Sequence, residues 1–362
     1  MNKEEAARAA AREFEGCGEI LSATPYGSGH INDTYRVVSQ QGNDEGTFIL
    51  QRINHNIFKD PVALMENIER VTLHMAGKIN GHPDRDRRFL RLIPTHDGRP
   101  WLRDSEDNYW RAYNFIEQAS SYDAVQSTGQ AFEAGRAFGK FQQMLADLPQ
   151  PRLHESIPDF HHTPKRFAAL ENAIGRDVAN RAAFARPEIE FALAHRSLVS
   201  RLLEANLPER VTHNDTKLNN VLIDDETGEG ICVIDLDTVM PGLAAYDFGD
   251  MVRTTTSPAK EDEQDLSKVR MDFPMFEALL RGYLEAAGNF LTKGEREALV
   301  LSGKLITFEI GVRFLTDHLS GDTYFKVHRP NHNLDRARTQ FKLVESIEAQ
   351  EDHMELLVAS LG

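Results

Sequence analysis

The sequence predicts an α+β protein with two lobes, a small antiparallel-sheet lobe over residues 1–116 and a larger, mainly helical lobe over residues 117–362. Three observations support this prediction. The chain has 362 residues, whereas single hydrophobic cores stop growing at roughly 250 to 300 residues. Apolar residues recur at every second position in much of the first part and at spacings of three and four in the second. A strand–turn–strand pattern interrupts the helical part at residues 211–239.

The small lobe begins with an Ala-rich segment, residues 3–15, which predicts a helix that ends at Gly16. Five strands are then expected, at residues 19–26, 32–39, 47–53, 89–94 and 109–116. Between the third and the fourth strand, a helix is predicted from Pro61, which suits a first helical turn, to about Lys78. We place the boundary between the lobes near Glu117.

The larger lobe is predicted to be helical because apolar residues follow one helix face over long segments. Helices are expected at residues 125–145, 163–175 and 188–204, and again after Ser267. The exception is a hairpin, in which the strand sequences VLID and GICVID flank a polar turn at residues 224–230. A long polar connection is predicted at residues 320–333, and loops of such length are often functional.

Composition excludes several classes of function. The net charge of −15 gives no general attraction to nucleic acid or to anionic lipid, so neither nucleic acid nor a membrane is an expected partner. Glu4 and Glu5 stand where a secretory signal is basic, and no apolar run is long enough to span a membrane, so we expect a cytoplasmic protein. Cys17 and Cys232 lie far apart and indicate neither a disulfide framework nor a zinc site.

The strongest chemical signal is the segment HNDTKLNN at residues 213–220, which is followed across the predicted turn by Asp235. Phosphoryl transfer needs a carboxylate to orient or deprotonate the attacking hydroxyl, a cation near the phosphates, and oxygen ligands for Mg²⁺. Asp215, Lys217, Asn220 and Asp235 supply these groups. The alternative is a solvated loop that carries the same residue types by chance. Four residue types at matching offsets favour catalysis.

This segment resembles the kinase catalytic loop H-x-D-x-K-x-x-N, and the resemblance implies a protein-kinase-like fold that uses ATP and Mg²⁺. By resemblance, Asp215 is the catalytic base and Lys217 neutralises charge on the transferred phosphoryl group. Asn220 and Asp235 hold the metal from adjoining strands of the catalytic hairpin.

Two further Asp residues lie downstream of the motif. Asp237 is either a second metal ligand or a bystander. Asp247 belongs to a literal DFG triplet, but it lies too far along the chain to be the metal ligand. It resembles instead the Asp that supports the catalytic loop in aminoglycoside and choline kinases.

The nucleotide is expected to contact two segments of the small lobe. Gly27, Ser28 and Gly29 join two predicted strands, where backbone N–H groups can approach phosphates because glycine has no Cβ; a plain turn is the alternative. Phe115 and Ile116 lie where the lobes should connect, so the backbone there is expected to bind adenine. The alternative for both is an ordinary place in the core.

The third predicted strand departs from the kinase pattern because it lacks the Lys that pairs with phosphate. Gln51 occupies the aligned position, and Arg52 follows it on the opposite face of an ideal strand. Arg52 would supply the charge if the strand is bulged, and is otherwise a surface residue. Glu66 resembles the helix Glu that pairs with such a cation, with a solvated helix face as the alternative.

Longer strings, from about Gly27 to Glu348, resemble the N-acetylhexosamine 1-kinases. These strings include GSGHINDTY, ILQRIN, YNFIE, THNDTKLNNVLID, VIDLDTVMPG, YDFGD and FLTDHLSGDTYFK. The resemblance implies that a small-molecule sugar, N-acetylglucosamine or N-acetylgalactosamine, accepts phosphate from ATP at its anomeric hydroxyl. It also implies that Asp215, Arg313 and Tyr324 contact the sugar, although Arg313 is alternatively an ordinary residue of a helix surface.

Two other functions stay open at this point, a kinase of another alcohol of aminoglycoside or choline type and a pseudokinase that only binds. A choline site needs an aromatic cage, yet Trp101 and Trp110, the two Trp residues of the chain, both fall in the small lobe. The presence of all four motif residues opposes the pseudokinase. The sequence determines neither the sugar epimer nor the oligomeric state.

Overall fold

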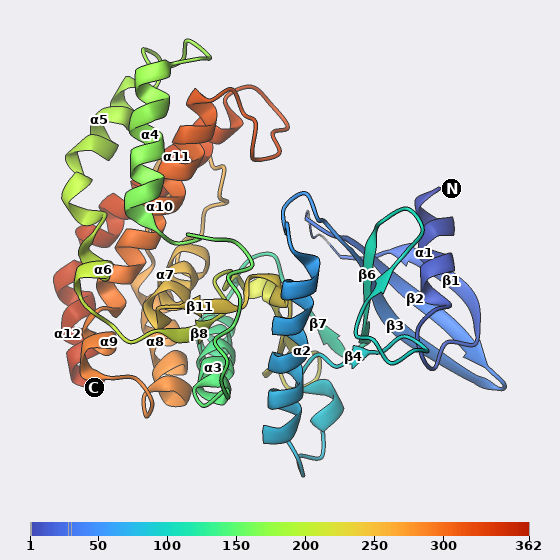
Figure 1. The fold of residues 1–362 in the computed structure, drawn as a ribbon. Helices are drawn as coiled ribbons and strands as arrows, with labels where there is room; N and C mark the ends of the chain where they lie inside the picture. The colour runs from blue at the N-terminus through green and yellow to red at the C-terminus, as the bar shows by residue number, and fades with distance from the viewer. Residues whose placement is uncertain (1, 28, 30, 362) are drawn as a thin grey trace.

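The computed structural model describes residues 2–27, 29 and 31–361 and has the predicted α+β architecture (Figure 1). A sheet lobe and a helical lobe lie side by side, with α2 (Pro61–Lys78) between them. This arrangement confirms the expected protein-kinase-like bilobal fold. Among the described residues, no helix has both the length and the apolar character that a membrane span requires.

The small lobe is built on one antiparallel sheet in the order β1-β2-β3-β6-β4, with β5 also paired to β6. Its strands are β1 (Glu19–Pro25), β2 (Asp33–Gln41), β3 (Asp44–Ile53), β4 (Leu92–Ile93), β5 (Leu102–Arg103) and β6 (Tyr109–Asn114). Successive strand residues point to opposite faces of the sheet. On one face Tyr35, Val37, Phe48 and Leu50 are buried against α1 (Lys3–Ala11).

The opposite face of the sheet packs against α2. The first turn of α2 is fixed by Pro61 and by Asp60, whose side chain accepts a hydrogen bond of 3.0 Å from the Ala63 N–H. Ile68 of α2 is fully buried in a cluster that includes Ile53 of β3. The same cluster extends into the large lobe, so α2 joins the two lobes through a continuous core.

The large lobe is mainly helical. Its helices are α3 (Thr128–Leu145), α4 (Thr163–Arg176), α5 (Arg186–Ala194), α6 (Arg201–Glu204), α7 (Ala244–Thr255), α8 (Phe273–Ala287), α9 (Lys293–Glu297), α10 (Leu299–Leu319), α11 (His332–Glu348) and α12 (Glu351–Leu361). The backbones of α3 and α8 nearly touch: a Cβ on Gly135 would lie 2.2 Å from the Leu279 carbonyl oxygen, and one on Gly282 2.0 Å from that of Phe132. Glycine permits this close approach because it has no side chain.

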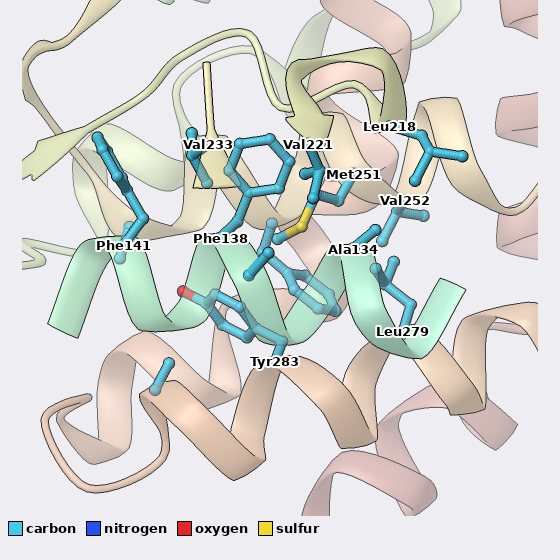
Figure 2. Packing of buried hydrophobic residues seen from close by; sticks show 14 of the residues in the cluster. Ala134, Phe138, Phe141, Leu218, Val221, Val233, Met251, Val252, Leu279 and Tyr283 are labelled. Atoms are coloured by element: carbon cyan, nitrogen blue, oxygen red, sulfur yellow. The ribbon is translucent and has the colours of Figure 1, made fainter. Parts of the chain in front are cut away.

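Short strands cover the other side of α3. β9 (Val221–Asp224) pairs with β10 (Gly230–Val233) and with β7 (Ala119–Ser120), and β8 (Arg210–Thr212) pairs with β11 (Met240–Gly242). Val221 and Val233 share a buried cluster with Phe138 of α3. The other side of α3 faces Leu279 and Tyr283 of α8 (Figure 2). The hairpin predicted within the helical lobe is therefore confirmed.

Several predicted elements differ in detail, and α1 ends at Ala11 rather than at Gly16. The helix expected at residues 188–204 is divided into α5, a 3₁₀ turn at Arg196–Leu198 and α6. At the division, His195 Nδ1 lies 2.8 Å from the carbonyl oxygen of Phe191 and competes with the His195 backbone N–H, which lies 3.3 Å from the same oxygen. The strand expected at residues 89–94 is formed only by the two residues of β4. The boundary proposed near Glu117 lies in the segment between β6 and β7.

Candidate active site

A buried carboxylate on α7 holds the segment that carries the catalytic motif. Asp247 is fully buried and accepts hydrogen bonds from the backbone N–H groups of His213, at 2.9 Å, and Asn214, at 2.7 Å. Gln142 of α3 donates a further bond of 2.7 Å to the same carboxylate. Burial raises the pKa of Asp247 against the opposing effects of His213 and these donors. The DFG aspartate thus supports the catalytic loop, as its resemblance implied.

The loop is also fixed by the strands on either side of it. Asn214 has a left-handed backbone, with φ of 65°, which Asn tolerates better than most residues. Its side chain donates to the carbonyl oxygen of Thr238 at 2.8 Å, and the Thr238 hydroxyl donates to that of His213 at 2.7 Å. These bonds tie the start of the loop to the segment after β10, so the motif and Asp235 are placed by one rigid frame.

Asp215 lies at the end of this frame beside two of the other predicted site residues. Its Oδ2 is 3.1 Å from Lys217 Nζ. The amide nitrogen of Asn220 donates to Asp215 Oδ2 at 3.1 Å and to the Asp215 carbonyl oxygen at 2.7 Å. Burial is the largest single effect on Asp215 and raises its pKa, but the positive charges of Lys217, His213 and Arg253 and the hydrogen bond from Lys217 together outweigh it, so the pKa is lowered. Asp215 is therefore an ionised carboxylate with a cation at its side.

Asp235 is held in a left-handed conformation, with φ of 62°, at the point where β10 leads into a 3₁₀ turn. Burial, followed by the negative charges of Asp237 and Asp215, raises the pKa of Asp235 to about 6. Asp235 is thus a buried carboxylate that is repelled by two other carboxylates, and this repulsion favours a bound cation.

The residues present fit Mg²⁺. Carboxylate and amide oxygens are its preferred protein ligands, and Asn220 uses its amide nitrogen on Asp215, which leaves the amide oxygen for a metal. Within residues 2–27, 29 and 31–361, no three His, Cys, Asp or Glu side chains gather closely enough to chelate a metal by themselves. A set of one or two carboxylates and an amide suits Mg²⁺, which takes further ligands from water and phosphate.

The nucleotide segments of the small lobe come together at the lobe connection. Gly27 has φ of 78°, in the left-handed region that favours glycine, whereas Ser28 lies outside the described residues and Gly29 has open space where a Cβ would be. Tyr26 contacts Phe115 edge-on, with ring centroids 5.9 Å apart. The glycine segment thus begins next to the position at which adenine was expected.

Ile116 belongs to the interface between the lobes. It is buried and packs in a cluster with Cys232 of β10, against which Leu222 and Ile234 also lie. These are the strand ends from which the catalytic hairpin leads to Asn220 and Asp235. Ile116 is therefore a core residue that also lies next to the candidate active site.

The structure does not place Arg52 in the cleft. Neither the β2–β3 register nor the β3–β6 register contains a bulge, so the condition for turning Arg52 inward is not met. Its Nε donates to Asp33 Oδ2 at 2.9 Å, on the sheet face opposite to that of Gln51. Glu66 contacts His154 at 2.7 Å and is half exposed, so it is not the partner of Arg52.

Sequence reasoning missed Arg111. This arginine lies opposite Gln51 on β6, is almost fully buried, and forms an ion pair with Asp237. A signal was present, because a charged residue in the strand sequence YWRAYN interrupts an otherwise apolar and aromatic strand. Such a residue needs a partner when it is buried.

The residues proposed for the acceptor gather around one end of α10. Arg313 packs over the rings of Phe160 and Phe325, 5.4 and 5.7 Å from their centroids. Tyr324 is 64% exposed and contacts the edge of Phe325. Asp317 shapes this loop by accepting the backbone N–H groups of residues 323, 324 and 325, each at 2.9 Å.

A buried polar chain connects this region with the catalytic loop. His161 Nε2 lies 3.2 Å from the carbonyl oxygen of Asn214, and its Nδ1 lies 2.9 Å from Glu309 Oε1 on α10.

Arg166 of α4 donates to the carbonyl oxygen of Phe160 at 3.0 Å. Arg313 lies over the ring of Phe160, so both guanidinium groups lie beside this residue, and burial and then the charge of Arg313 lower the pKa of Arg166. Arg166 was not predicted from the sequence.

Comparison with known proteins identifies the architecture. The profile of a family described as APH, phosphotransferase enzyme family, matches residues 22–293. A solved microcompartment-associated aminopropanol kinase is 17% identical, with a TM-score of 0.65 over 97% of this chain and 98% of the other. A spectinomycin phosphotransferase in complex with ADP and spectinomycin is 13% identical, with a TM-score of 0.60 over 97% and 99%. A choline/ethanolamine kinase family protein from Mesorhizobium loti is 17% identical, with a TM-score of 0.54 over 99% of each chain. At these identities the likeness shows the fold.

Proposed function

Since the chain belongs to the phosphotransferase enzyme family, we propose that it transfers the γ-phosphoryl group of ATP to the anomeric hydroxyl of an N-acetylhexosamine, N-acetylglucosamine or N-acetylgalactosamine. The site geometry supports such a transfer through Asp215, Lys217, Asn220 and Asp235. The strings that resemble N-acetylhexosamine 1-kinases support this acceptor.

In the proposed reaction, Asp215 orients the anomeric hydroxyl and accepts its proton as the sugar oxygen bonds to the γ-phosphorus. The bond from that phosphorus to the β-bridging oxygen breaks, and its electrons leave with ADP. Lys217, 3.1 Å from Asp215, keeps the carboxylate ionised and places positive charge beside the transferred group. Mg²⁺ bound by Asn220 and Asp235 would neutralise phosphate charge. Because the transition state is loose, a weakly basic carboxylate is sufficient.

The observation that carries the acceptor proposal is that two guanidinium groups meet at Phe160: Arg313 lies over its ring and over that of Phe325, and Arg166 donates to its carbonyl oxygen. Two neighbouring cations disfavour a positively charged acceptor such as choline or an aminoglycoside. They are donors for the hydroxyl and N-acetyl carbonyl oxygens of a neutral sugar, and aromatic rings pack on sugar C–H faces. Glu309, which is buried and bonded to His161 and Thr163, offsets part of this positive charge as a single carboxylate facing two guanidinium groups.

The test is a panel of acceptors supplied with ATP and Mg²⁺. It contains the two N-acetylhexosamines, glucose, galactose, choline, aminopropanol and spectinomycin, and phosphorus NMR identifies the carbon that is phosphorylated. We expect the N-acetylhexosamines to give 1-phosphates at the highest kcat/KM. Preferred turnover of an amino alcohol, or phosphorylation of a sugar at another carbon, would contradict the acceptor proposal.

A further inference from the structure

A polar pair lies on the sheet face that packs against α2. Gln51 and Arg111 are directly opposite each other in the register of β3 and β6. The Nε and Nη2 of Arg111 donate hydrogen bonds of 2.9 and 2.8 Å to Gln51 Oε1. Gln51 Nε2 donates in turn to Thr34 Oγ1 of β2 at 3.0 Å. Three consecutive strands therefore fix the orientation of one guanidinium group.

Arg111 is 1% exposed, and its remaining edge points toward the other lobe. Its Nη1 forms an ion pair with Asp237 Oδ1 of the catalytic hairpin. Among the described residues, Nη1 nevertheless finds no partner with hydrogen-bond geometry. Burial is the largest single effect on Arg111 and lowers its pKa, but Asp237, Tyr113 and Asp235 together outweigh it and raise the pKa above that of an ordinary arginine. The edge of Arg111 that bears Nη1 is thus buried and charged, with Asp237 as its counter-ion.

Asp237 receives a second contact from the small lobe. Asn32, close after the glycine segment, donates from Nδ2 to Asp237 Oδ2 at 2.5 Å, and its Oδ1 accepts the N–H of Asn54 at 2.9 Å. Asp237 lies two residues after the candidate metal ligand Asp235. The edge of Arg111 that bears Nη1 therefore faces the place at which the phosphates of a nucleotide meet the metal ligands.

We propose that Arg111 is the phosphate-binding cation of this enzyme and replaces the lysine that β3 lacks. The proposal rests on the proposed function, because it requires a nucleotide polyphosphate in the cleft. Gln51 uses Nε and one N–H of Nη2, so Nη1 and the second N–H of Nη2 form the edge that faces Asp237, and this edge matches two phosphate oxygens. When a nucleotide binds, its phosphate would displace Asp237 as the counter-ion of Arg111. The alternative is that Arg111 and Asp237 only join the lobes.

The experiment measures the binding of ADP, AMP and adenosine by calorimetry in excess chelator, with no acceptor and no turnover. Arg111→Met removes the charge and keeps much of the side-chain length. Asp237→Asn leaves the arginine but removes its counter-ion. Because Arg111→Met alone leaves a buried, unpaired carboxylate and is at risk of misfolding, the double variant Arg111→Met/Asp237→Asn is compared with Asp237→Asn.

A phosphate-binding Arg111 predicts opposite effects for Asp237→Asn compared with the wild type and for the double variant compared with Asp237→Asn. Asp237→Asn should bind ADP at least as tightly as the wild type, because phosphate no longer competes with the carboxylate. The double variant should bind ADP at least tenfold more weakly than Asp237→Asn does. The loss of affinity for AMP should be smaller than this, and the affinity for adenosine should be unchanged. Equal ADP affinity of the double variant and Asp237→Asn would overturn the proposal, as would parallel losses for ADP and adenosine.

This result is separate from the acceptor assay. If ADP binding depends on Arg111 while no hexosamine is phosphorylated, the acceptor proposal fails and the role of Arg111 stands. If hexosamine 1-phosphate is produced while ADP affinity does not change when Arg111 is replaced, with or without Asp237→Asn, the proposal for Arg111 fails and the acceptor proposal stands.

Discussion

Among single residues, a substitution of Asp215 distinguishes acceptance of the hydroxyl proton from positioning of the hydroxyl. Asp215→Asn keeps the size of the side chain but cannot accept the hydroxyl proton. General-base catalysis contributes typically about 10²- to 10⁴-fold, and a loose transition state favours the lower end, so kcat should fall by roughly 10²-fold. Binding of ADP should persist. Single-turnover transfer and ADP affinity are measured on the same protein.

The matched control is Asp225→Asn, an exposed carboxylate in the turn of the catalytic hairpin. It should leave kcat unchanged. A kcat for Asp215→Asn close to that of this control would remove Asp215 from the reaction.

Arg313 and Tyr324 test the acceptor side of the cleft. Each is expected to contact the sugar alone, so truncation to Ala should raise the KM for the sugar by roughly five- to tenfold, the worth of about one hydrogen bond, and leave the KM for ATP unchanged. Arg281→Ala on α8, whose partner Glu277 lies on the same helix, is the control. A change confined to the KM for ATP would place both residues at the nucleotide.

At the scale of residues, the sequence predicts a contact best when the two residues lie close together along the chain. Asp215, Lys217 and Asn220 lie within one short loop, so their spacing alone indicates that they meet. Arg111 and Asp237 meet only because a strand of one lobe faces a hairpin of the other. Strand periodicity assigns Arg111 to a face, but it does not identify the residue across the cleft. For the same reason Arg52 was considered although its partner, Asp33, lies on the outer face.

Among the elements, the contact between α3 and α8 makes the sharpest stability prediction. Gly135→Ala places a Cβ against the backbone of Leu279, which cannot move without displacing α8. Overpacking of this kind costs about 1–3 kcal/mol, so thermal unfolding should occur at a lower temperature.

Gly175→Ala in α4 is the matched control, since no atom lies within 4 Å of its added Cβ. It should be neutral or stabilise the protein by up to about 1 kcal/mol, because alanine favours a helix. Equal unfolding temperatures for the two variants would show that the helices can separate at no cost.

The sequence predicted elements best where the pattern was long or the turn distinctive. The hairpin was found from its turn residues, and α2 from its apolar spacing and first-turn proline. Strands of two residues, such as β5 and β7, have too few positions for any period to be seen. At the division of residues 188–204, one side chain, His195, competes for a backbone carbonyl, which periodicity does not reveal.

For the whole molecule, the two sides of the lobe interface are built differently. Near the lobe connection, Arg87 pairs with Asp224 at 2.7 Å, and Arg88 makes two bonds of 2.7 and 2.9 Å to Glu229. At the candidate active site, Arg111 and Asn32 of the small lobe both contact Asp237. The strong pairs are expected to act as the pivot, and the cleft side as the part that moves.

Closure about this pivot should exclude water from the transferred phosphoryl group. Small-angle scattering should show a smaller radius of gyration with a non-hydrolysable ATP analogue, Mg²⁺ and sugar together than with the protein alone. The analogue without sugar is the control for partial closure. An unchanged profile at saturation of both ligands would indicate a cleft that is already closed.

The buried carboxylates beneath the catalytic loop have a consequence for hydrogen exchange. The amide hydrogens of His213, Asn214 and Thr216 are bound to Asp247 and Asp250 inside the large lobe rather than to neighbouring strands. They should therefore exchange with solvent deuterium only when that lobe unfolds, as slowly as the amides of its core helices. An active-site loop with this protection would report the global stability of the lobe, whereas fast exchange at these three amides would show that the loop opens by itself.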